Sequence, residues 1–180
     1  MKHITTELEI NNKDQVLALF KSDYINSERI GVIGKNNTNF EELCKLMQID
    51  GDLIKTFVFT NLNPDEASGV HTDGPLHHTG LFIPLNDKPI TFNWWDVSNN
   101  PKNNSTNIGF YDNDIEIILD TNLITISDTV TSLNPVITKV SDFHNVSNNS
   151  NDRLFGISIR LVNDKPIDEI SVADYEAVFI

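Results

Sequence analysis

The sequence predicts a mainly β fold, a jelly roll (double-stranded β-helix) preceded by N-terminal helices. Three observations predict it. From Leu53 onward, short β-branched and aromatic segments recur between clusters of Asn, Asp, Gly and Pro, as strands do between turns. Helical periodicity is confined to about the first fifty residues. The length of 180 residues suits a single domain, with a helical or mixed support at 1–52, a jelly-roll core at 53–163 and a C-terminal extension at 164–180.

Two short helices and one short strand are expected in the support region. Residues 14–21 (DQVLALFK) carry an apolar face at helical spacing. Residues 40–49 (FEELCKLMQI) follow Asn39, which together with Glu42 fits a capping box. Between these two helices, residues 29–33 (RIGVI) have the composition of a short strand.

The core region is expected to consist of many short strands. They span residues 53–60, 69–73, 79–85, 90–96, 107–111, 115–119, 123–127, 136–145 and 153–162. Many short strands with few helices between them indicate a sandwich or a closed barrel, and a jelly roll is the architecture that we expect. An immunoglobulin-like sandwich is the alternative, but the chain lacks the Cys-Trp-Cys pattern that favours it.

Composition limits the partners that the protein can have. The formal net charge of −13 repels phosphate backbones, so we expect no nucleic-acid partner. The N-terminus has no apolar signal segment and no apolar run is long enough to span a bilayer, so we expect a cytoplasmic protein, in the host cytoplasm if viral, with no membrane partner. The single cysteine, Cys44, is expected to be a buried apolar residue on a helix.

A His-x-Asp unit formed by His71 and Asp73 is the strongest chemical signal. Side chains at i and i+2 of a strand point to the same face, so this imidazole and this carboxylate can reach one metal ion. A third ligand must come from a distant strand, and His144 within 136–145 can supply it. Two histidines and one carboxylate form the facial triad of non-haem Fe(II) oxygenases. The sequence therefore predicts an Fe(II) site in which these three residues are both metal ligands and catalytic residues.

Two arginines could anchor a chelating co-substrate such as 2-oxoglutarate. A guanidinium suits its far carboxylate because it pairs bidentately and stays charged when buried. Arg153 shares one strand face with apolar residues from Phe155 to Leu161, so we expect it to point into the core. Arg160 is the second choice, and a bulge at Gly156 would reverse this order.

The sequence also resembles a known family. Residues 71–86 (HTDGPLHHTGLFIPLN), the TFNWW strand and the stretch FHNVSNNSNDRLFGISIRL resemble the 2-oxoglutarate/Fe(II)-dependent dioxygenase superfamily, nearest to small phage and bacterial oxygenases and to prolyl and aspartyl/asparaginyl hydroxylases. The matching positions are His71, Asp73, Leu85, Asn86, His144, Val146, Asn148 and Arg153. The resemblance covers about residues 53–163 and departs at Phe155, where some branches have a serine.

The resemblance implies a specific chemistry. Fe(II), 2-oxoglutarate and O2 would serve as cofactor and co-substrates, with ascorbate in support. The reaction would be hydroxylation, with a peptide or protein side chain, or a small molecule, as substrate. His71, Asp73 and His144 would hold the iron, and Arg153 would bind 2-oxoglutarate.

Other functions fit parts of the same pattern. A non-catalytic jelly-roll module for binding or structure would have the same strands without a metal. His77 and His78 could form a zinc site with His71, although they follow a Pro-Leu turn and fit rim positions better. A cupin would need His-x-His and a following Glu, whereas this unit ends in Asp. Trp94 and Trp95 point to opposite faces of one strand, so we expect one in the core, while the other could line a substrate mouth.

Overall fold

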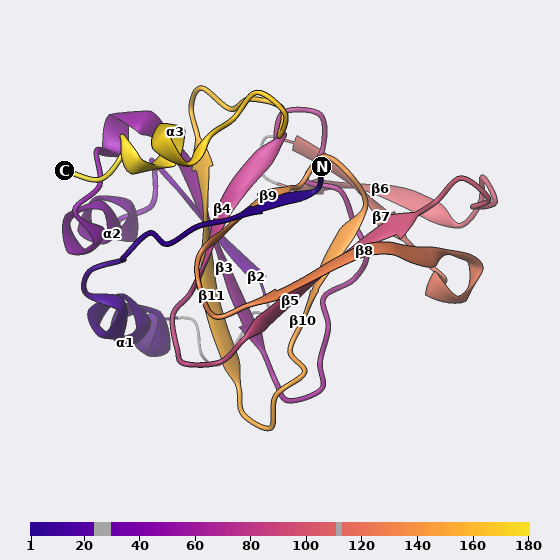
Figure 1. Ribbon diagram of the computed structural model, residues 1–180, viewed down its shortest axis with the longest axis horizontal. Helices are drawn as coiled ribbons and strands as arrows, with labels where there is room; N and C mark the ends of the chain where they lie inside the picture. Colours follow the sequence, from indigo (N-terminus) through magenta and orange to yellow (C-terminus); the bar gives the residue numbers. More distant parts are fainter. Residues whose placement is uncertain (24–29, 111–112) are drawn as a thin grey trace.

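A computed structural model describes residues 1–23, 30–110 and 113–180. The described chain forms antiparallel sheets that face each other, and the α-helices lie beside the larger sheet (Figure 1). This mainly β architecture confirms the predicted fold class. No helix among the described residues is long and apolar enough to cross a bilayer.

The larger sheet has six strands in the order β1-β9-β4-β11-β3-β2. Their bounds are His3–Thr5 (β1), Val136–Lys139 (β9), Thr79–Pro84 (β4), Leu154–Leu161 (β11), Ile54–Leu62 (β3) and Ile30–Gly34 (β2). All neighbouring pairs are antiparallel, and late strands lie between early ones, as β11 does between β3 and β4. This interleaving of the two halves of the core is the topology of a jelly roll.

The smaller sheet contains three strands in the order β10-β5-β8, together with the hairpin β6-β7. Their bounds are His144–Ser147 (β10), Ile90–Asp96 (β5), Thr125–Ser132 (β8), Ser105–Phe110 (β6) and Asn113–Ile118 (β7). His71 joins the hairpin to the sheet, because it forms one isolated bridge with His144 and another with Ile117. The hairpin extends away from the body of the molecule (Figure 1).

Two of the expected strands differ in the structure. Residues 69–73 form only isolated bridges, because their backbone groups bond to several segments: the N–H of Asp73, for example, donates to the carbonyl of Val140 at 2.9 Å. The expected strand 136–145 is two strands, β9 and β10, on different sheets. The chain leaves the larger sheet at residues 140–143 and enters the smaller one at His144.

Three α-helices complete the described elements: α1 (Lys13–Asp23), α2 (Asn39–Met47) and α3 (Val172–Glu176). Single 3-10 turns occur at Gly51–Leu53 and Thr121–Leu123. The predicted capping box is wrong, because α2 begins at Asn39 and its N-cap is Thr38, which makes no capping hydrogen bond through its side chain. The short helix α3 was not predicted.

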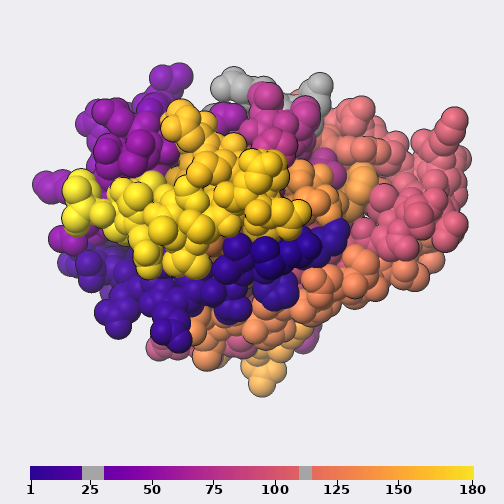
Figure 2. Space-filling model, turned by 45° about the horizontal axis from the view of Figure 1, so that its top comes forward, coloured from indigo at the N-terminus to yellow at the C-terminus, as the bar shows by residue number. Residues whose placement is uncertain are grey.

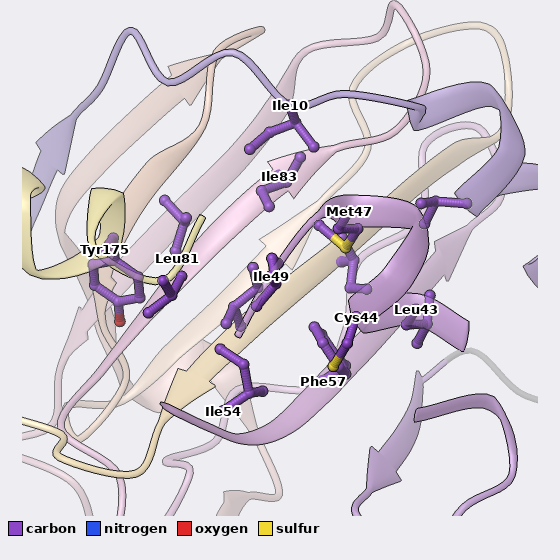
Figure 3. Close-up of a cluster of buried hydrophobic side chains, with 14 of the residues drawn as sticks. Ile10, Leu43, Cys44, Met47, Ile49, Ile54, Phe57, Leu81, Ile83 and Tyr175 are labelled. Atoms are coloured by element: carbon purple, nitrogen blue, oxygen red, sulfur yellow. The ribbon is translucent and has the colours of Figure 1, made fainter. Parts of the chain in front are cut away.

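The helices are held to the larger sheet by an apolar cluster (Figure 3). In this cluster Leu43, Cys44 and Met47 of α2 pack with Phe57 of β3 and Leu81 of β4. Cys44 is buried on a helix, as expected, and burial raises the pKa of its thiol to about 11. The thiol is therefore protonated at neutral pH and acts as a small apolar group.

Both faces of the larger sheet are buried. On β11, Phe155, Ile157 and Ile159 belong to the cluster that packs against the helices. Leu154 belongs to a second cluster with residues of β5 and β10, between the two sheets. Alternate side chains of β11 therefore enter two different interiors, and Arg160 lies on the face that looks toward the smaller sheet.

The two ends of the chain lie side by side on one face of the molecule (Figure 2). The terminal amino group of Met1 lies 3.9 Å from Asp168. Tyr175 of α3 is fully buried, and its hydroxyl lies 3.3 Å from Oγ1 of Thr79 on β4. The C-terminal extension is thus docked onto the larger sheet.

Asp174 stabilises the start of α3, and its removal is testable. Its carboxylate pairs with Lys165 at 2.6 Å and accepts the N–H and Oγ–H of Ser171 at 2.8 and 2.7 Å. The bonds from Lys165 and Ser171 lower the pKa of Asp174 to about 2. Because the group is exposed, we expect Asp174→Asn to lower the free energy of unfolding by only about 0.5–1 kcal/mol near pH 6.

The contribution of the Asp174 carboxylate to the free energy of unfolding should depend on pH. The folded pKa lies below the unfolded value of about 3.9, so the stabilisation is complete above about pH 4 and is lost as the pH falls through 2. Urea denaturation at pH 6 and pH 2.5 should show the difference between wild type and variant shrinking at the lower pH. Glu176→Gln on the same helix is the control. An unchanged difference at both pH values would contradict the role of the ionised carboxylate.

Candidate metal centre

Three side chains from two separate segments, residues 71–73 and the start of β10, meet between the two sheets. One nitrogen each from His71 and His144 and one oxygen of Asp73 lie within 4.8 Å of one another. Nε2 of His71 is 3.4 Å from Oδ1 of Asp73, and Nε2 of His144 is 3.7 Å from the same oxygen. A metal about 2.1 Å from each ligand places neighbouring ligand atoms about 3.0–3.4 Å apart in octahedral or tetrahedral geometry. The spacing is close to what a single ion requires.

The backbone orients both imidazoles toward this point. Nδ1 of His71 lies 2.8 Å from the carbonyl of Gly69, and Nδ1 of His144 lies 2.9 Å from the carbonyl of Asp142. Because a carbonyl only accepts, each Nδ1 carries the hydrogen and donates it. When each imidazole is neutral, the lone pair of its Nε2 therefore lies on the side of Asp73. Metal-binding histidines in proteins are usually fixed by this kind of contact.

The electrostatics keep the carboxylate charged and one imidazole neutral. Burial would raise the pKa of Asp73, but Arg160 and the hydrogen bond with His71 hold that pKa well below its usual range. Burial and the neighbouring His71 lower the pKa of His144 to about 4. Burial also disfavours the charged form of His71, but its hydrogen bond to Asp73, the charge of Asp73 and the Gly69 carbonyl together outweigh this and raise its pKa. Near neutral pH the centre thus presents an ionised carboxylate and a neutral His144.

Arg160 lies directly behind the carboxylate. It is only 4% exposed, its Nε is 3.2 Å from Oδ2 of Asp73, and its Nη2 also contacts that oxygen. Its Nη1 donates to Oγ of Ser158 on the same strand face. Gly80 leaves the space for this guanidinium, because a Cβ there would lie 1.6 Å from Nη1. The arginine inside the barrel is therefore the one that the sequence placed second.

Arg153 does not point into the barrel, and that prediction is wrong. Its side chain is exposed, and its Nε and Nη2 donate to Oδ1 of Asn63 at 3.2 and 2.9 Å. The apolar residues of β11 that share its strand face, from Phe155 to Ile159, face the helices on the opposite side of the sheet from the metal centre. No bulge occurs at Gly156. The register shift on β11 lies between Arg160 and Leu161.

Two asparagines of the family-like pattern hold turns together. The amide of Asn86 donates to the carbonyl of Arg153 at 2.8 Å and accepts the N–H of Phe155 at 3.1 Å, which fixes the start of β11. Asn148 is fully buried, and its Nδ2 donates to three backbone carbonyls of neighbouring turns. Both residues support the fold around the centre without touching it.

The remaining histidines and tryptophans have other roles. Neither His77 nor His78 belongs to the group of ligand atoms around His71, which is the only such group among the described residues. Trp94 is fully buried and donates to the carbonyl of Lys139 at 2.8 Å. Trp95 lines a cleft of about 780 Å³ on the other face of the same strand. One tryptophan of the pair therefore lies in the core, as expected, and the other lines a cleft.

No protein-family model matches the chain, and no curated protein matches it significantly. Solved structures of similar fold exist. A cupin domain from Bordetella pertussis has a TM-score of 0.30 and 16% identity, over 63% of this chain and 86% of that one. A mutant of Bacillus subtilis oxalate decarboxylase has a TM-score of 0.40 and 12% identity, over 90% of this chain and 33% of that one. Peruvianin-I, a cysteine peptidase from Thevetia peruviana latex, has a TM-score of 0.42 and 8% identity, over 77% of this chain and 64% of that one.

This chain thus spans about a third of the length of the oxalate decarboxylase and less than two thirds of Peruvianin-I. All three TM-scores are below 0.5, so no argument about this chain follows from these similarities.

The contact between Gly80 and Arg160 can be tested by a mutant cycle. Gly80→Ala should displace the guanidinium from Asp73 and lower the free energy of unfolding by about 2–4 kcal/mol, measured by urea denaturation. In an Arg160→Ala background the same substitution should cost less, although Oγ of Ser158 would still lie 2.9 Å from the new Cβ. Equal costs in both backgrounds would show that Gly80 does not serve to accommodate Arg160.

Proposed function

We propose that this protein is a non-haem Fe(II), 2-oxoglutarate-dependent oxygenase that hydroxylates a peptide or protein side chain or a small molecule. The observation that carries the proposal is the convergence of His71, Asp73 and His144 between the sheets, with Arg160 buried beside them. Bound iron, with 2-oxoglutarate and O2, would supply the oxidising chemistry, in which 2-oxoglutarate is converted to succinate and CO2. The chain itself would hold the ion, orient the co-substrate and limit the access of water.

The pairing of Asp73 supports an open coordination sphere. Its Oδ2 is bound by Arg160, whereas its Oδ1 is the oxygen nearest to both imidazoles. A metal would therefore take one oxygen from Asp73 and one nitrogen from each histidine. Three protein ligands leave three positions of an octahedron for a bidentate co-substrate and a further ligand.

Arg160 is the residue that we propose for binding the carboxylate of the co-substrate. A guanidinium has five N–H groups, and the contacts to Asp73 and Ser158 use three of them within the described residues. Two donors remain for a second carboxylate. Because Arg160 already neutralises Asp73, the charge of a bound divalent ion would strengthen the attraction of the centre for a dianion.

Asp73→Ala is expected to abolish the activity. The test is incubation of the full chain with Fe(II), ascorbate and 2-oxoglutarate, with release of succinate as the readout and elemental analysis of the protein as a second measurement. Wild type should bind one iron per chain and form succinate slowly without substrate, and Asp73→Ala should do neither. The matched control Asp65→Ala removes an exposed carboxylate outside the centre. Full activity of Asp73→Ala, or bound zinc without any response to 2-oxoglutarate, would refute the proposal.

The two arginines can be separated by parallel substitutions. Arg160→Lys keeps the charge but loses the planar fork, and we expect it to weaken 2-oxoglutarate binding at least about tenfold, measured by calorimetry with Mn(II) in place of Fe(II). Arg153→Lys should leave that affinity unchanged, because Arg153 is exposed and bound to Asn63. The reverse result would return the role to Arg153.

A further inference from the structure

A cleft of about 780 Å³ lies beside the metal centre but on a different face of the smaller sheet. Thr72 lines it, whereas its neighbours His71 and Asp73 turn toward the interior of the barrel. In the same way Trp95 lines it while Trp94 is buried between the sheets. The cleft is therefore on the outer face, where the hairpin β6-β7 joins the sheet. The residues that define its chemistry are Thr72, Trp95, Asp96, Asn107, Glu116 and Phe143.

The walls of the cleft carry uncompensated negative charge. The charged residues that line the cleft are Lys2, Asp96, Glu116 and Asp142, one positive and three negative. Lys2 shares the carboxylate of Asp142 with Lys139, which lies outside the lining. Asp96 is exposed. Within the described residues its carboxylate accepts hydrogen bonds only from the N–H of Ser98, at 2.8 Å, and from the hydroxyl of the same serine. Glu116 forms backbone bonds with Thr72, but within the described residues its carboxylate has no ion pair.

The floor of the cleft is aromatic. Trp95 is half-buried, and its Nε1 donates to Oδ1 of Asn145 at 3.0 Å, which uses its one polar atom and fixes the ring. Phe143 is also half-buried and packs with Trp95 against a small apolar cluster that contains Val70 and Ile118. A rigid aromatic surface beside two carboxylates that have no ion pair within the described residues attracts cations, both by charge and through the ring faces.

We propose that this cleft is a binding site for a cationic side chain, lysine or arginine, of a peptide or protein. The long aliphatic part of such a side chain would pack on Trp95 and Phe143, and its charged end would reach Glu116 and Asp96. An anionic ligand would be repelled. A purely apolar one would remove the Glu116 carboxylate from water without giving it a partner. The proposal rests on the cleft alone and not on the metal centre.

The position of the cleft also links it to the centre. Thr72 and Gly74, on either side of Asp73 in the chain, both line it, and Asp142, whose carbonyl orients His144, lies on its wall. A peptide held there would pass the segments that carry all three ligand candidates. On the proposed function of the centre, the cleft would recognise a basic residue next to the one that reacts; this link rests on that function, whereas cation binding in the cleft does not.

Nuclear magnetic resonance titration tests the proposal without any metal. The probes are the Nα-acetyl methylamides of lysine, arginine, norleucine and glutamate, added to the full-length wild-type chain. We expect the lysine and arginine compounds to shift the indole N–H signal of Trp95 and the amide signals of Thr72 and Glu116. The indole signal of Trp94, which is bonded to Lys139 in the interior, should not move. Norleucine and glutamate compounds should bind at least about fivefold more weakly.

Matched variants identify the charge responsible. Glu116→Gln keeps the shape of the side chain and should weaken lysine binding at least about threefold, and high salt should do the same. Asp52→Asn removes an exposed carboxylate in the 3-10 turn between α2 and β3, which does not line the cleft, and should have no effect. Equal binding of the norleucine compound, tighter binding of the glutamate compound, equal effects of both variants, or no shift at Trp95 would each overturn the proposal.

Discussion

The buried ion pair between Asp73 and Arg160 governs the arrangement of the centre. A carboxylate or a guanidinium alone between two sheets would cost several kcal/mol in lost hydration, roughly as estimated for buried unpaired ions. Together, and with Ser158 accepting from Nη1, the two charges satisfy each other. The pair keeps Asp73 ionised and directs its second oxygen toward the imidazoles. The ion pair that offsets the cost of burying Asp73 therefore also leaves a negatively charged oxygen of Asp73 facing the imidazoles, where a cation can bind.

The larger sheet can accommodate this ion pair because its two faces differ in polarity. One face is uniformly apolar and packs against the helices, which supplies most of the hydrophobic stabilisation. The other face is apolar near the paired residues Leu154 and Leu62 and polar near Ser158 and Arg160, at the end where the ligand candidates meet. The N-terminal helices therefore contribute to the site indirectly. They cover the apolar face of the larger sheet, which would have to be polar if it were exposed to water.

Much of the fold could be predicted because strand alternation and turn residues are local signals. The expected strand 90–96 coincides with β5, and 79–85 differs from β4 by one residue. The segment 69–73 could not be assigned from alternation, since its backbone bonds are divided among three neighbouring segments. Helix α3 is five residues long and depends on the docking of Tyr175, so its own sequence carries little helical signal.

The candidate site shows the same limit of local reasoning. Spacing alone predicted which residue types could meet, and His71, Asp73 and His144 do lie together. The choice between Arg153 and Arg160 depended on which face of β11 looks toward the centre. Alternation shows that two faces exist but does not say which is the interior of the barrel when both are buried. The apolar face was taken for that interior, and this led to the wrong arginine.

The distribution of charge separates two kinds of ligand. Because Arg160 balances Asp73, a divalent ion in the centre would leave its own two positive charges uncompensated, and a dianionic chelator would neutralise them. Across the backbone of residues 72–74, the cleft carries the opposite sign, from Asp96 and Glu116. An anionic co-substrate and a cationic substrate group would each be attracted to one region and repelled by the other. Residues 72–74, which separate the centre from the cleft, would then keep the anionic co-substrate and the cationic group from binding at the same site.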